Sequence, residues 1–198
     1  FSGNLSDCSS RLSAALLRGG RGNSGVILSL FFRGIAKSFA GKNEADLNDL
    51  ANAFKAGVEA AYKAVRHPTE GTVLTVMRVM SENACELADE YQQADKIGAF
   101  FDKMAEICTD VLNDTPNMLP VLKQAKVVDA GGMGFTLIIR GMALAANGTV
   151  FEDSEGESES TKDSADFADF DAVNIKFPYC TECIVDKSDS CNDEKVSL

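Results

Sequence analysis

The sequence has few of the residues that mark several protein classes. It contains no Trp, only four Pro and three Tyr, and a single His. No apolar run reaches the roughly 18 residues that a membrane-spanning helix requires. Asp and Glu outnumber Lys and Arg by 30 to 19, so the clustered basic surface of a nucleic-acid-binding protein is not expected. The scarcity of Pro beside 16 Gly favours helices joined by glycine-rich junctions over a turn-rich β protein.

The acidic charge is concentrated in one segment. Residues 152–171 contain nine Asp or Glu and a single Lys, and so carry −8 of the net charge of −11. Such a composition is typical of a flexible, self-repelling linker. We therefore expect a helical domain at 1–151, a linker at 152–171 and the start of a second domain at 172–198. Residues 173–177 alternate between apolar and polar, which predicts the first strand of that second, truncated domain.

Apolar residues recur at three- and four-residue spacing throughout the first 150 residues, which predicts a series of helices. We expect Ser6 or Asp7 to cap the first helix, Asp46 to cap the third and Pro68 to end the third. Thr115 is expected to cap a short sixth helix with Pro116 in its first position. The other helices are expected at about 24–40, 72–92, 95–113 and 131–147. Helices of this length joined by short loops pack antiparallel, so the fold class is an all-α helix bundle.

Three of these helices begin in glycine-rich segments that also carry Ser, Thr or Asp, at residues 18–28, 67–74 and 127–135. The free N–H groups of a first helical turn, together with the positive end of the helix dipole, form an anion site. Each segment is also compatible with an ordinary capped helix start, in which Asn23 or Ser24 caps the second helix. Three such starts indicate one ligand at one end of the bundle. This requires that the short sixth helix lies across that end, so that all three starts are on the same side.

Three charged or titratable residues in these segments each allow two interpretations. Glu70 either places a group near a bound phosphate or interacts with the dipole of the following helix. Asp129 either accepts hydrogen bonds from a ribose or caps the seventh helix. His67, next to Pro68, is expected to be an exposed loop residue rather than a catalytic base.

The six cysteines fall into two groups. Cys8, Cys85 and Cys108 lie within predicted helices, which indicates core or half-buried residues of a reducing compartment such as the cytoplasm. Cys180 and Cys183 have a spacing found in zinc sites, but a structural zinc takes four ligands. Only Cys191 is nearby, so no metal site is expected.

Four motifs occur in a fixed order along the chain. They are Gly22-Asn23-Ser24-Gly25-Val26-Ile27-Leu28-Ser29, Glu70-Gly71-Thr72-Val73-Leu74-Thr75-Val76-Met77-Arg78, Val128-Asp129-Ala130-Gly131-Gly132-Met133-Gly134 and Tyr179-Cys180-Thr181-Glu182. In this order and spacing they resemble the nucleotide-binding subunit of bacterial fatty acid kinase. The N-terminal domain of that subunit is similar to the L subunit of dihydroxyacetone kinase (DhaL). The resemblance runs from about residue 12 to residue 185, with the acidic linker as an insertion.

The resemblance implies a barrel of about eight antiparallel helices that binds ATP and Mg²⁺ at one end. Gly22, Asn23, Ser24 and Gly25 would hold phosphates through backbone N–H groups and the Ser24 hydroxyl. Gly71 and Thr72 would form a second wall of the nucleotide site. The remaining implied site residues, near ribose and adenine, are Asp129, Gly131 and Gly132. The implied acceptor is a fatty acid carried by a separate binding protein, the product is an acyl phosphate, and no catalytic residue is assigned.

The sequence departs from this family in one respect. Family members bind Mg²⁺ through an Asp-rich loop that precedes the Gly-Asn-Ser-Gly motif, and these 198 residues contain no such loop. Because phosphoryl transfer depends on metal neutralisation of phosphate charge, we expect this piece to be inactive alone, with some apolar surface uncovered. Two alternatives stay open. One is a small-polyol kinase of the dihydroxyacetone type, and the other is a non-catalytic helical module with a vestigial nucleotide pocket. Whether the chain forms a homo-oligomer also stays open. Tyr179-Cys180-Thr181-Glu182 favours the fatty acid type.

Overall fold

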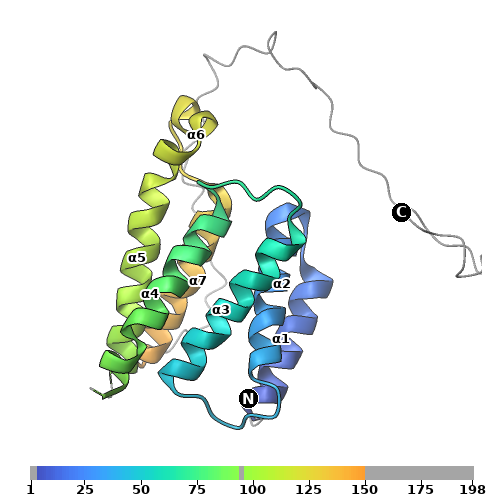
Figure 1. Cartoon of the computed structure of the whole chain (residues 1–198), viewed down its shortest axis with the longest axis vertical. Helices are drawn as coiled ribbons and strands as arrows, with labels where there is room; N and C mark the ends of the chain where they lie inside the picture. Colours follow the sequence, from blue (N-terminus) through green and yellow to red (C-terminus); the bar gives the residue numbers. More distant parts are fainter. Residues whose placement is uncertain (1–3, 94–95, 150–198) are drawn as a thin grey trace, which may run out of the picture. The chain divides into compact units, whose positions relative to one another are not determined.

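The computed structural model describes residues 4–93 and 96–149, and every regular element within them is a helix (Figure 1). The described helices are α1 (Leu5–Gly19), α2 (Gly22–Ser38), α3 (Leu47–Ala64), α4 (Val73–Gln93), α5 (Ile97–Met118), α6 (Pro120–Ala125) and α7 (Ala130–Ala146). The all-α prediction is therefore confirmed. The predicted acidic linker and the strand at 173–177 lie outside the described residues, as do Cys180 and Cys183.

Consecutive helices pack on one another, from α1 on α2 through to α4 on α5, and α7 then packs against both α5 and α4. Aromatic rings join the two ends of this series. The ring of Phe31 in α2 lies 6.2 Å from that of Phe54 in α3 and 5.3 Å from that of Phe135 in α7. All three side chains are fully buried, and burial of each contributes about 1.5–3 kcal/mol. The core thus holds α2 beside α7.

Helices α2 and α3 approach each other closely where Gly34 faces Gly57. A Cβ atom on Gly34 would lie 2.5 Å from the carbonyl oxygen of Ala56 and 2.6 Å from the Cα of Gly57. A Cβ atom on Gly57 would in turn lie 2.8 Å from the Phe31 ring. The two glycines therefore allow the backbones to touch, and a larger residue at either position would separate them.

The helix caps differ in part from those predicted. The Asn4 side chain caps α1 by accepting a 2.8 Å hydrogen bond from the Asp7 amide, so the prediction of Ser6 or Asp7 as the cap was wrong. Asp46 caps α3 as predicted, because its carboxylate accepts a 2.7 Å hydrogen bond from the Asp49 amide. The α1 prediction failed because Asn4, Ser6 and Asp7 can all act as caps, and the true cap lies two positions before Ser6.

The predicted break between residues 113 and 116 does not exist. Helix α5 continues through Pro116 to Met118, so Thr115 caps nothing and Pro116 does not begin a helix. Pro116 lacks the N–H group that would bond to the Leu112 carbonyl. The Thr115 hydroxyl donates a 2.7 Å hydrogen bond to that carbonyl instead. The shorter α6 begins with Pro120 in its first turn, where a missing N–H group is tolerated.

Several large apolar side chains are exposed on the described helices. Those on α1, α2 and α7 are Leu12, Leu17, Val26, Met133, Leu137 and Leu144. No helix within residues 4–93 and 96–149 combines the length and hydrophobicity needed to cross a membrane.

Three cysteines lie in the described helices and have different environments. Cys108 is buried and Cys8 is half-buried, as predicted, but Cys85 is exposed. The helical pattern placed Cys85 near the core, whereas the structure places it at the edge of a pocket between α3 and α4. Burial raises the pKa of the Cys108 thiol to about 12.

We expect Cys108 to resist alkylation in the folded protein. Only the thiolate is nucleophilic, and at pH 8 a thiol with this pKa is ionised in about one molecule in ten thousand. Iodoacetamide treatment followed by peptide mass spectrometry should show Cys85 modified well before Cys108, and unfolding in guanidinium should remove the difference. Equal rates in the folded protein would contradict the burial of Cys108.

Candidate nucleotide-binding site

The starts of α2, α4 and α7 lie at the same end of the bundle (Figure 1). A Cβ atom on Gly131 would lie 3.0 Å from the Ser24 hydroxyl oxygen and 3.3 Å from the Cβ of Val73. The three helix starts therefore meet within van der Waals distance. They line a pocket of about 330 Å³, whose residues are Ser24, Gly25, Leu28, Val73, Ala130, Gly131, Gly134, Phe135 and Ile138. We call this the α2–α7 pocket.

Helix α2 begins without a side-chain cap. Its N-cap residue is Arg21, which makes no capping hydrogen bond, and both Asn23 and Ser24 are exposed. The interpretation of Asn23 or Ser24 as the cap was therefore wrong, because both residues lie inside the first turn. Gly22 has a φ of 63°, which glycine adopts without steric cost. The first-turn N–H groups, which have no intrahelical partner, are thus left for another acceptor.

The side chain of Arg21 closes the preceding turn. Its guanidinium donates hydrogen bonds to the carbonyl oxygens of Arg18, at 3.1 Å, and of Gly20, at 2.9 Å. Carbonyls at the end of a helix have no intrahelical partner, so this arginine stabilises the end of α1 directly before α2 begins. The turn between the two helices consists of only Gly20 and Arg21.

Helix α7 begins with a cap from Asp129. The Asp129 carboxylate accepts a 2.6 Å hydrogen bond from the Gly132 amide, and its own N–H donates a 3.1 Å hydrogen bond to the Thr115 hydroxyl. Of the two interpretations of Asp129, capping is the one that the structure displays. Gly132 is buried, and a Cβ there would lie 3.1 Å from Val76. Gly131 is half-buried and lines the α2–α7 pocket, so it is the more accessible of the two glycines.

The segment before α4 is held by its own hydrogen bonds. Gly71 has a φ of 82° and donates a 2.8 Å hydrogen bond to the Thr75 hydroxyl. The Thr72 hydroxyl donates a 2.8 Å hydrogen bond to the Thr69 carbonyl. Neither Gly71 nor Thr72 lines the α2–α7 pocket, whereas the next residue, Val73, does. The two predicted site residues are therefore neighbours of the pocket lining in the sequence but are not part of it.

Glu70 is engaged by side chains of its own chain. Its carboxylate accepts hydrogen bonds from Thr75 at 2.7 Å, from Arg78 at 2.9 Å and from Tyr62 at 3.2 Å. Burial raises the pKa of Glu70, but these donors outweigh it and the net pKa is lowered. Glu70 is thus an ionised anchor for the loop before α4. His67 is exposed on this loop.

Sequence reasoning missed the apolar side of the site and the partners of Glu70. The pocket walls include Leu28, Phe135 and Ile138, which the sequence identified only as core residues of their helices. Arg78 stood eight residues after Glu70 in the second motif, but Glu70 precedes α4, so the helical i,i+4 rule gave no signal for their ion pair. Tyr62 lies on α3, and nothing in the sequence connected it to Glu70.

The described residues offer no cluster for a metal ion. Within residues 4–93 and 96–149, no three His, Cys, Asp or Glu residues are grouped so that they could hold one. The site instead combines unpaired N–H groups, a hydroxyl and apolar walls. Its volume lies within the range of small-molecule sites, about 300–1,000 Å³. The arrangement suits a ligand with an anionic group joined to a flat or apolar body.

Comparison with known proteins identifies related chains. A family model described as the DAK2 domain matches residues 2–144. Uncharacterized proteins of Staphylococcus epidermidis (strain ATCC 35984) and Staphylococcus aureus (strain USA300) are each 38% identical to this chain over 189 residues, covering 93% of it and 34% of their own length. An uncharacterized protein of Staphylococcus saprophyticus is 39% identical over 177 residues, covering 87% of this chain and 32% of its own length. The chain thus spans about a third of the length of the curated relatives it matches.

Proposed function

The chain belongs to the DAK2 domain family, and on this premise we propose that it is the nucleotide-binding part of an ATP-dependent phosphotransferase. The family is associated with kinase subunits. The observation that carries the proposal is the meeting of the uncapped α2 start with the α7 start. A Cβ atom added to Gly131 would lie 3.0 Å from the Ser24 hydroxyl oxygen there, in a pocket with apolar walls.

The residues of the α2–α7 pocket fit a nucleotide by their chemistry. The N–H groups of Gly22, Asn23 and Ser24 and the hydroxyl of Ser24 would hold phosphate oxygens, assisted by the α2 dipole, with Gly25 beside them in the pocket wall. The base and ribose would lie along Gly131 and the apolar wall. Asp129 already accepts a hydrogen bond from Gly132, so it would approach the ribose only with its remaining lone pairs. When bound, ATP would supply the γ-phosphoryl group.

No residue of the described helices is assigned to magnesium. The family resemblance implies Mg²⁺, but these residues hold no group of three metal-ligating side chains. We therefore assign no residue of this chain to Mg²⁺ and derive no step through it. The role of the described helices is to bind and orient the nucleotide.

For the acceptor, we propose a fatty acid carried by a separate binding protein, with an acyl phosphate as the product. The support is the order of the four motifs, above all Tyr179-Cys180-Thr181-Glu182 after the helical domain. The staphylococcal relatives are uncharacterized by name, so their names support no particular acceptor.

Substituting Ser24 tests the nucleotide site. Ser24 is exposed and makes no hydrogen bond within the described chain, so Ser24→Ala should leave the melting temperature unchanged. A hydrogen bond to a charged group contributes about 1.5–3 kcal/mol, so the affinity for ATP should fall at least about tenfold. Isothermal titration calorimetry with ATP, with and without Mg²⁺, measures this change on the full chain.

The matched control is Ser38→Ala at the opposite end of α2, which should bind ATP with unchanged affinity. Equal affinity of Ser24→Ala and the unmodified chain, or no ATP binding by the unmodified chain, would contradict the proposed site.

A further inference from the structure

The hydroxyl of Thr75, in the first turn of α4, is used differently from other hydroxyls inside the described helices. Those of Ser29, Thr109 and Thr136 each donate to a carbonyl three or four residues earlier in their own helix, which is a common arrangement. Thr75 donates instead to the Glu70 carboxylate, at 2.7 Å. Its hydroxyl proton therefore points out of α4, toward the segment that precedes the helix.

The oxygen of the same hydroxyl holds the backbone of this segment. Because the single hydroxyl proton of Thr75 is directed to Glu70, the oxygen presents its lone pairs to another donor. It accepts a 2.8 Å hydrogen bond from the Gly71 amide. Thr75 is 1% exposed and Gly71 is buried, and a buried N–H group needs such a partner. Glu70 thus acts on its neighbour Gly71 through a side chain of α4.

Gly71 has close neighbours on its other side. A Cβ atom there would lie 2.9 Å from the Cβ of Leu119 and 3.0 Å from the Cβ of Met118. The segment before α4 therefore packs against the junction of α5 and α6. Its remaining freedom is movement away from that junction, and the hydrogen bond to Thr75 opposes this movement.

The position of Gly71 affects the wall of the α2–α7 pocket. Val73 follows Gly71 by two residues, is buried and lines the pocket. Its Cβ lies 3.3 Å from the position that a Cβ on Gly131 would take. The intervening Thr72 carbonyl accepts a 2.9 Å hydrogen bond from the Thr75 amide. A shift of Gly71 would therefore be passed to Val73 and change the shape of the pocket.

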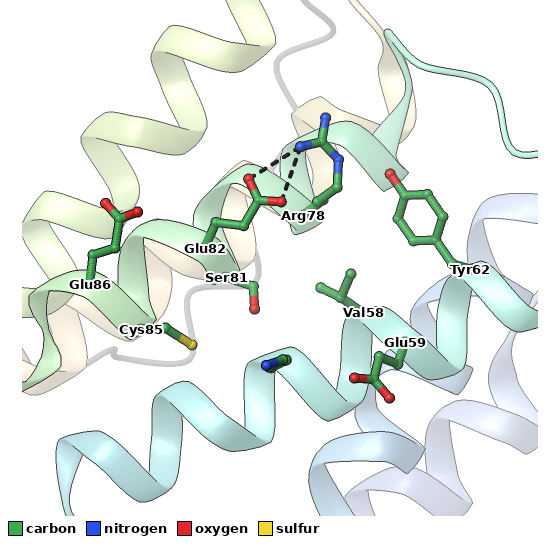
Figure 2. Close-up of a pocket in the computed structure, with 9 residues that line it drawn as sticks. Val58, Glu59, Tyr62, Arg78, Ser81, Glu82, Cys85 and Glu86 are labelled. Carbon is green, nitrogen blue, oxygen red and sulfur yellow. Dashed lines mark hydrogen bonds and ion pairs between the residues drawn. The ribbon is translucent and has the colours of Figure 1, made fainter.

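Two side chains on different helices hold the Glu70 carboxylate in place. Arg78 on α4 donates to it at 2.9 Å, and Tyr62 on α3 donates at 3.2 Å. Figure 2 shows both side chains at the pocket between α3 and α4, where Arg78 also bonds to Glu82. The Glu70 side chain is about half exposed, so a single surface ion pair would restrain it little. Donors from two helices fix it more firmly.

We propose that Glu70 is a positioning residue of the nucleotide site, which acts through the Thr75 hydroxyl on the Gly71 amide and thereby on Val73 in the pocket wall. This role rests on the proposed nucleotide function. The Glu70 carboxylate already has three donors and would repel a phosphate, so we assign no direct contact with the nucleotide to it.

Hydrogen exchange of the Gly71 amide tests the first part of this role without nucleotide. In Glu70→Ala, the Thr75 proton loses its acceptor and can turn to the carbonyl four residues earlier, which weakens the hydrogen bond of the Gly71 amide. Exchange measured by NMR on the full chain should be at least about tenfold faster at Gly71. The matched control is Glu106→Ala, which removes an exposed carboxylate bonded to Lys103 on α5 and should leave Gly71 unchanged. Equal exchange in Glu70→Ala and the unmodified chain would overturn the proposal.

Calorimetry with ATP on the full chain tests the second part. Glu70→Ala should bind ATP at least about threefold more weakly, and Glu106→Ala should bind it with unchanged affinity. Thr75→Val keeps the shape of the side chain and should weaken binding by a similar factor. The double variant should bind no more weakly than Thr75→Val, because Glu70 acts through that hydroxyl. Losses that multiply in the double variant would indicate direct contact between Glu70 and ATP, and would overturn the positioning role.

Failure of this role and failure of the proposed function give different results. If the unmodified chain binds ATP and Glu70→Ala binds it equally well, the positioning role is overturned and the nucleotide site stands. If the unmodified chain does not bind ATP, the proposed function is overturned and this role with it. Circular dichroism confirms that each variant is folded at the temperature of the titration. If Thr75→Val does not fold, the exchange rate and the ATP affinity of Glu70→Ala decide the question.

Discussion

Gly34→Ala is expected to destabilise the chain by at least about 3 kcal/mol, the upper end of the usual range for overpacking. The added methyl group would lie 2.5 Å from the Ala56 carbonyl oxygen and 2.6 Å from the Gly57 Cα. Both are backbone atoms, so no side-chain rotation can relieve the clash. Alanine is favoured over glycine inside a helix by about 1 kcal/mol, which is too little to compensate. Urea unfolding followed by circular dichroism measures the loss.

Gly141→Ala is the matched control within another helix. A Cβ at Gly141 in α7 meets no atom within 4 Å, so only the helix preference acts there. This variant should be more stable than the unmodified chain by up to about 1 kcal/mol. If Gly34→Ala behaved like Gly141→Ala, the close crossing of α2 and α3 would be wrong.

Thr115→Val is expected to lower the free energy of unfolding by about 2–4 kcal/mol, because it removes both hydrogen bonds of a buried hydroxyl. The Thr115 hydroxyl donates to the Leu112 carbonyl and accepts from the Asp129 amide. Valine has nearly the same shape, so packing is preserved. Since Pro116 cannot donate to Leu112, the substitution leaves that carbonyl without both the usual i+4 amide and the hydroxyl that replaces it. The same urea titration measures the change.

Thr136→Val separates this effect from the general loss of a buried hydroxyl. Thr136 is also fully buried and donates a 2.8 Å hydrogen bond to the Gly132 carbonyl. That carbonyl keeps its helical partner, the amide four residues later, so the loss should stay below about 1 kcal/mol. Equal losses in the two variants would show that Thr115 has no special role at Pro116.

The helices could be predicted from the sequence because apolar periodicity dominates them. The predicted ranges of about 72–92 and 131–147 differ by one residue at each end from α4 and α7. The continuation of α5 through Pro116 could not be predicted, because a proline normally ends a helix. Pro116 is tolerated inside α5 because the Thr115 hydroxyl bonds to the Leu112 carbonyl. The same hydroxyl accepts a hydrogen bond from Asp129, 14 positions later. Such a tertiary hydrogen bond leaves no local signal in the sequence.

The candidate site was predictable in outline. The three glycine-rich helix starts were recognised from the sequence, and the family match confirms that their motifs identify a DhaL-like domain. The chemistry of the individual residues was less accessible. An aspartate before a Gly-Gly helix start looks the same whether it caps, as Asp129 does, or binds a ribose. The engagement of Glu70 by Tyr62 depends on how α3 packs against α4.

The uncapped first turn of α2 also affects which part of the described helices unfolds locally first. A side-chain cap typically contributes about 1 kcal/mol, and α2 lacks this contribution at the end that faces the ligand pocket. The turn should therefore fray ahead of the core, and its amides should exchange with solvent early. If an anion accepts hydrogen bonds from these amides as we propose, it would close the turn, and the thermal stability of the helical domain would then rise with its concentration through mass action.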